Sequence, residues 1–156
     1  MSLRVRPAAP GRRRERGGTL VEFALVAPLA ILLIMAALEL AILFWVNLTL
    51  QHAVREGARY AVTGQGGALR DQLALQRIVD QSMGLYQRVQ PVLSINRTAV
   101  NADPASVQPG TLGAGGALLV LQIDGAWPVA SPLLQPWLGT AYRFHVAATM
   151  RNEAFD

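Results

Sequence analysis

The chain has no cysteine and no lysine, and these absences narrow the kinds of site it can carry. Without cysteine it forms neither a disulfide framework nor a thiolate metal site. The two histidines, His52 and His145, are far apart in the sequence and have no cluster of carboxylates near them, so we expect no metal site. No nucleophile paired with a base, no phosphate-binding loop and no paired-carboxylate motif is visible. We therefore expect a protein that is not an enzyme and needs no cofactor.

The charge is distributed unevenly along the chain. All 14 basic residues are arginine, and six of them precede Gly17 against one acid, Glu15, so residues 1–17 carry 6 − 1 = +5. Residues 18–156 carry 8 arginines and 9 acids, a net charge of −1. An arginine run can bind nucleic acid. Here it adjoins an apolar segment, where arginines hold the N-terminus in the cytoplasm. We expect residues 1–17 to be a disordered cytoplasmic leader, with no nucleic-acid partner.

Only one long apolar run is present. Phe23 to Val46 contains 24 residues with a single charge, Glu39. As a helix it would be about 36 Å long, enough to cross a hydrocarbon core of about 30 Å. The run is longer than the apolar part of a signal peptide, and no small-residue cleavage site follows it. The sequence therefore predicts a retained single-pass membrane helix, with the globular remainder on the far side of the membrane.

The helical pattern continues beyond this run. Leu50, Val54, Ala58 and Ala61 recur at helical spacing, so we predict one helix over residues 18–63. Pro28 removes a backbone hydrogen bond within that helix, which predicts a kink or local unwinding there.

The remaining residues, 64–156, are predicted to form a small α+β domain. The glycines at 64–67 end the first helix, and a second helix is expected over Ala68–Tyr86, with Pro91 blocking its continuation. One face of that helix carries the apolar residues Leu75, Ile78, Val79, Met83 and Tyr86. Strands are predicted at 92–99, 117–127 and 142–151, which gives an antiparallel sheet of three to four strands. Trp127 and Trp137 are expected to pack the sheet against the helix, with an exposed contact surface as the alternative.

A carboxylate lies near the start of the membrane segment. Glu22 follows the apolar residues Leu20 and Val21, where a charge costs up to roughly 2.5–3.5 kcal/mol at the bilayer centre and less toward the interface. One interpretation is a side chain that reaches back to the headgroups, favoured by the positive end of the helix dipole. The other depends on spacing, because Glu22 is the fifth residue after a cut between Gly17 and Gly18.

That spacing resembles the processing site of type IV prepilins and pseudopilins. The segments "GGTLVEFALVAP", "ALELAI" and "LTLQHAVREGARYAV", with the end "VAATMRNEAF", are similar to those of TadE-like proteins, the minor pilins or pseudopilins of the tight-adherence (Flp) pilus. The resemblance implies that a prepilin peptidase cuts between Gly17 and Gly18 on the cytoplasmic side. It also implies that Glu22 pairs with a free N-terminal amine during assembly, since a charge in a low-dielectric site needs a partner.

The same resemblance implies the location and the partners. We expect a minor pilin in the bacterial inner membrane, with a periplasmic or extracellular domain. Its expected partners are the prepilin peptidase, other pilin and pseudopilin subunits, the assembly platform in the inner membrane, and membrane lipid. Two alternatives stay open: an uncleaved single-pass anchor that scaffolds an envelope complex, and a pseudopilin of a secretion system.

A second acid, Glu39, lies 17 residues beyond Glu22, about 25 Å along a straight helix and near the far interface. It is either an acid that reaches for the interface or a contact with a neighbouring subunit's helix. In the second case the expected partners include Arg55 or Arg59, and Glu56 is a further candidate contact.

Overall fold

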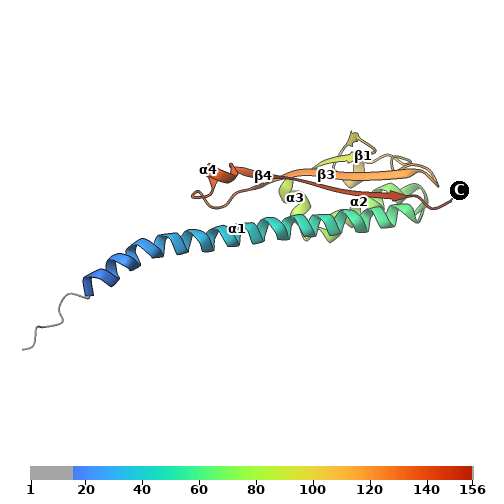
Figure 1. Cartoon of the computed structure of the whole chain (residues 1–156). Helices are drawn as coiled ribbons and strands as arrows, with labels where there is room; N and C mark the ends of the chain where they lie inside the picture. Colours follow the sequence, from blue (N-terminus) through green and yellow to red (C-terminus); the bar gives the residue numbers. More distant parts are fainter. Residues whose placement is uncertain (1–15, 156) are drawn as a thin grey trace, which may run out of the picture. The chain divides into compact units, whose positions relative to one another are not determined.

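The computed structural model describes residues 16–155 and has an α+β fold, as the sequence predicts. It divides into two compact units, one through Ala37 and one from Leu38 onward. The predicted leader 1–17 lies almost wholly outside the described residues. The elements are α1 (Arg16–Val62), a 3-10 turn η1 (Gly67–Leu69), α2 (Arg70–Gln81), α3 (Leu85–Val89), β1 (Val92–Ile95), β2 (Thr98–Val100), η2 (Pro104–Ser106), β3 (Leu118–Pro128), α4 (Gln135–Leu138) and β4 (Ala141–Arg151) (Figure 1).

Helix α1 belongs to both units and changes character along its length. The helix continues through Pro28, so the local unwinding predicted there is absent. A kink of the helix axis at Pro28 stays a prediction. In the second unit one face of α1 is buried at the predicted helical spacing. The buried residues are Val46, Leu50, Ala53, Val54, Ala58 and Ala61. This stripe makes the second half of α1 a core helix of the domain.

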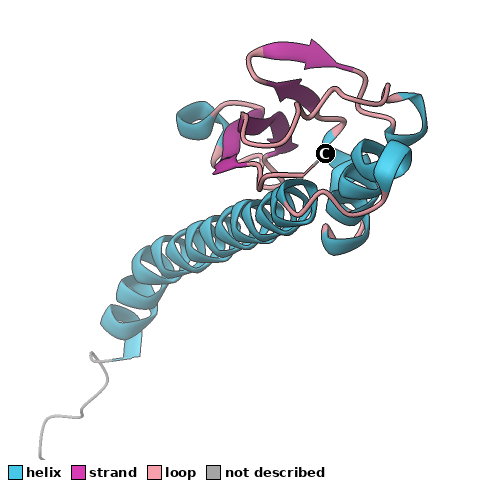
Figure 2. Ribbon diagram, turned by 90° about the vertical axis from the view of Figure 1, so that its right-hand side faces the viewer, coloured by secondary structure: helices cyan, strands magenta, loops and turns pink. Residues whose placement is uncertain are grey.

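The four strands form one antiparallel sheet in the order β2-β1-β3-β4. The long pair β3–β4 places Leu121 opposite Ala148 and Ile123 opposite Val146. These side chains point to one face and are buried, as the alternating pattern predicts. The second half of α1, with α2 and α3, lies on that side of the sheet (Figure 2), whereas α4 lies at the end of the β3–β4 pair (Figure 1). One hydrophobic core therefore joins α1, α2 and the sheet.

The contact between α1 and α2 depends on a glycine. A Cβ atom at Gly57 would overlap the side chain of Ile78 and lie 2.8 Å from the carbonyl oxygen of Ala74. Only a residue without a side chain allows the two helices to approach this closely.

Two predicted elements are broken by turns. The predicted helix 68–86 is wrong beyond Gln81, because Met83 and Gly84 adopt left-handed φ angles of 53° and 80° and start the separate helix α3. Met83, predicted on the buried face, is exposed. The predicted strand 92–99 is instead a hairpin. Its two-residue turn, Asn96–Arg97, has positive φ at both positions, as tight hairpin turns require.

Buried polar groups hold the loop that precedes β3. Arg70 and Asp71 form a buried ion pair of 3.0 Å, and they also bind the backbone of Gly113 and Leu112. The Nδ2 amide of Asn152 donates hydrogen bonds to the carbonyl oxygens of Leu112, Gly113 and Ala114. Such buried hydrogen bonds position the loop against the end of the sheet.

Candidate functional site: an apolar helix with two glutamates

The first unit exposes apolar side chains along α1. The large exposed residues there are Leu20, Val21, Phe23, Leu25, Val26, Leu29, Ile31, Leu33 and Ile34. A helical surface of this kind needs an apolar environment around it. Among the described residues one helix, Gly18–Val62, is long and apolar enough to cross a membrane. This helix indicates a single-pass membrane anchor.

Glu22 lies on this exposed part of α1. Its side chain is exposed between the exposed apolar residues Val21 and Phe23. The peptide bond between Gly17 and Gly18, the predicted processing site, lies in the first turn of the helix, which begins at Arg16. A carboxylate in such apolar surroundings gains most from a positively charged partner.

Glu39 has a different environment, although it lies on the same helix. Its side chain is 4% exposed, and both carboxylate oxygens accept hydrogen bonds from backbone N–H groups. Oε1 is 2.9 Å from the nitrogen of Ala130, and Oε2 is 3.2 Å from that of Ser131. The partners of this acid are thus in its own chain, in the connection between β3 and β4. Two N–H groups satisfy a buried carboxylate without a counter-charge.

The three other predicted contact residues lie farther along α1. Arg55 and Arg59 are exposed, and Arg59 forms an ion pair of 3.0 Å with Glu56 one turn before it. The structure does not bring any of them to Glu39, and a contact between subunits through them stays a prediction. An exposed pair of this kind contributes little to stability, about 0–1 kcal/mol.

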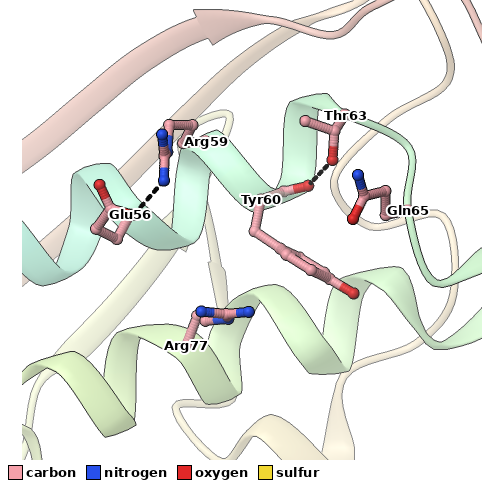
Figure 3. A pocket seen from close by; sticks show the side chains of 6 residues that line it. All are labelled: Glu56, Arg59, Tyr60, Thr63, Gln65 and Arg77. Carbon is pink, nitrogen blue, oxygen red and sulfur yellow. Dashed lines mark hydrogen bonds and ion pairs between the residues drawn. The ribbon is translucent and has the colours of Figure 1, made fainter.

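A polar cavity of about 270 Å³ lies beside this pair (Figure 3). Its lining residues are Glu56, Arg59, Tyr60, Thr63, Gln65 and Arg77. The guanidinium of Arg77 lies 5.5 Å from the centre of the Tyr60 ring, a cation–π distance that fastens α2 to the end of α1. The cavity thus lies where two helices meet.

The β3–β4 connection, residues 129–140, is a functional candidate that the sequence reasoning missed. For Trp137 the sequence predicts packing against the helix, with an exposed contact surface as the alternative. Trp127 is partly buried against the core, whereas Trp137 is 73% exposed, so that prediction is wrong for Trp137. The signal in the sequence is the absence of any charged residue from Pro128 to Tyr142.

The fold and the helix together define a class: an α+β protein with one long apolar N-terminal helix that serves as a single-pass membrane anchor. Within that class, residues 17–59 match the family model described as TadE-like protein. The chain therefore carries a TadE-like segment, which confirms the predicted resemblance. That segment includes the predicted processing site, Glu22 and Glu39, together with the predicted contact residues Arg55, Glu56 and Arg59. Comparisons with curated proteins and with solved structures gave no match.

Proposed function

We propose that the protein is a minor pilin or pseudopilin that takes part in assembly of a Tad-type pilus. The TadE-like segment indicates this pilus system and association with its other components. In this proposal a prepilin peptidase cuts between Gly17 and Gly18 in the inner membrane. The arginine leader stays in the cytoplasm, and the second unit lies on the other side. The role is assembly through helix packing, without catalysis.

The observation that carries the proposal is the environment of Glu22. This acid lies exposed on an apolar helix surface, four residues after Gly18 and within the family match. In an ordinary anchoring helix an acid at this position loses hydration, and only the headgroups and the helix dipole offset that loss. After cleavage the amine of Gly18 on a neighbouring subunit would supply the opposite charge. The pair then favours one register between adjacent helices.

Glu39 contrasts with Glu22 and supports the assignment of different roles. Its carboxylate is already hydrogen-bonded inside the chain, so it is not the acid that awaits a partner. Of Glu22 and Glu39, only Glu22 has an exposed side chain, so in this proposal it is the acid that contacts another subunit.

The proposal is tested by replacing Glu22 with Ala in the native host and measuring pili on the cell surface. The matched control is Glu153→Ala, which removes another exposed acid outside the helix. We expect the Glu22→Ala chain to reach the membrane and be cleaved, while piliation is lost and the control assembles normally. Normal piliation with Glu22→Ala would favour an uncleaved envelope anchor. A defect in protein secretion with pili intact would favour the secretion-system alternative.

A further inference from the structure

The β3–β4 connection presents apolar side chains that no other part of the described chain, residues 16–155, covers. It is closed at its base by the pairing of Pro128 with Ala141 and by a hydrogen bond of 3.0 Å from the Val129 nitrogen to the Thr140 oxygen. Within this protrusion Leu133, Trp137 and Leu138 are all exposed. The connection lies at the end of the sheet away from the C-terminus (Figure 1).

The exposed apolar surface continues onto α1 and β4. A small, mainly apolar groove of about 80 Å³ lies beside the connection, lined by Leu40, Leu43, Phe44, Asn47 and Tyr142. No aspartate, glutamate or arginine occurs between Glu39 and Arg55. An exposed aromatic and aliphatic surface without charge is unusual on a domain surrounded by water.

The bonds of Glu39 tie this surface to one position along α1. From Gly18 to Glu39 the helix rises by about 32 Å, close to the hydrocarbon thickness of about 30 Å. A membrane span that starts at Gly18 therefore ends near Glu39, although the apolar run itself continues to Val46. Because Glu39 is bonded to the N–H groups of Ala130 and Ser131, the connection lies at the same depth.

We propose that the β3–β4 connection docks on the outer leaflet of the membrane that α1 crosses, with Trp137 at the level of the lipid headgroups. Tryptophan is enriched at that depth because its ring is apolar and its N–H finds polar partners there. Docking gives the domain a second attachment besides the helix, and so restricts its tilt against the bilayer. The inference depends on α1 crossing the membrane and does not require a pilus role.

The test uses the full chain in lipid vesicles, with one tryptophan per protein and lipids brominated at defined depths. In the first variant Trp45 and Trp127 are replaced by Phe, so that Trp137 is its single tryptophan. The matched control carries its only tryptophan as Leu118→Trp, at the other end of β3. Leu118 is 60% exposed and about 30 Å along the strand from Pro128. A third variant, Ile31→Trp, reports whether α1 crosses the bilayer.

We expect lipids brominated near the headgroups to quench most of the Trp137 emission and to leave the Leu118→Trp emission unchanged. Lipids brominated deep in the chains should quench Ile31→Trp. Unquenched Trp137 with quenched Ile31→Trp would overturn docking while leaving the anchor intact. If the emission of Ile31→Trp is not quenched, α1 does not cross the bilayer, and the docking proposal is wrong as well. If the Trp137 emission changes with the protein-to-lipid ratio but not with bromination, Trp137 contacts a neighbouring subunit and the docking proposal is wrong.

A second measurement on the unaltered chain covers the case in which the Phe replacements unfold the domain. In lipid nanodiscs, headgroups that carry a nitroxide should broaden the Trp137 indole resonance and spare the methyl resonances of Leu118. Equal broadening of both, or of neither, would contradict the proposal.

Discussion

Removing the carboxylate of Glu39 should release the β3–β4 connection from α1. The Glu39→Ala change leaves the N–H groups of Ala130 and Ser131 without their acceptors, the first at a partly buried position and the second at a buried one. Hydrogen bonds to a charged group contribute about 1.5–3 kcal/mol each, so the loss of two costs at least about 3 kcal/mol. Since about 1.4 kcal/mol corresponds to a factor of ten, opening of the connection becomes about a hundredfold more frequent.

The assay is hydrogen exchange of these two amides, followed by NMR on the full chain in nanodiscs. Glu39→Gln keeps one acceptor oxygen, so its exchange should rise about tenfold through the loss of one bond. The control is Glu56→Gln, which breaks the more exposed pair with Arg59 on the same helix and should leave these amides unchanged. Exchange in Glu39→Ala that equals the unaltered protein would refute the reasoning.

Three further predictions concern the stability of the domain. Gly57→Ala should lower the free energy of unfolding by about 1–3 kcal/mol, because the added Cβ overlaps α2. The control Gly18→Ala should leave that free energy unchanged, because its Cβ meets no atom. Denaturant unfolding of the full chain in micelles compares the two variants. Burial raises the pKa of Tyr86 to about 12, and its hydroxyl donates to a backbone oxygen. The folded state therefore keeps a proton that the unfolded state releases above its ordinary pKa near 10, so stability should be full below pH 10 and fall by up to about 3 kcal/mol through pH 12. Tyr86→Phe should abolish that tyrosine contribution, and an unchanged alkaline limb in unfolding curves would contradict it. Asn152→Ala should speed proteolysis of the loop before β3, because the loop loses the three hydrogen bonds that the Asn152 amide donates to it, while the exposed Thr149→Ala should not.

Periodicity predicted the larger elements because their patterns are local. The helical stripe from Leu50 to Ala61 and the alternation in β3 and β4 each follow from one segment of sequence. The errors occur at turns. Gly84 ends a helix that its apolar pattern would continue, and Asn96–Arg97 forms a tight turn without the glycine that usually marks one.

The site was predicted only in part, because the environments of Glu39 and Trp137 depend on contacts between residues that are distant in the sequence. Glu22 could be selected because its spacing to Gly18 resembles that of prepilins. The partners of Glu39 are 91 and 92 residues away along the chain, so no local pattern contains them. The same holds for Trp137, because a tryptophan in a proline-rich segment suits a buried crossover as well as an exposed one.

The most direct test of the pilin proposal is the N-terminal sequence and intact mass of the protein taken from membranes of cells with and without the prepilin peptidase. The proposal predicts a chain that begins at Gly18 when the peptidase is present and keeps its arginine leader when it is absent. A chain with its leader in both samples would contradict it and would leave a single-pass anchor with an uncleaved N-terminus.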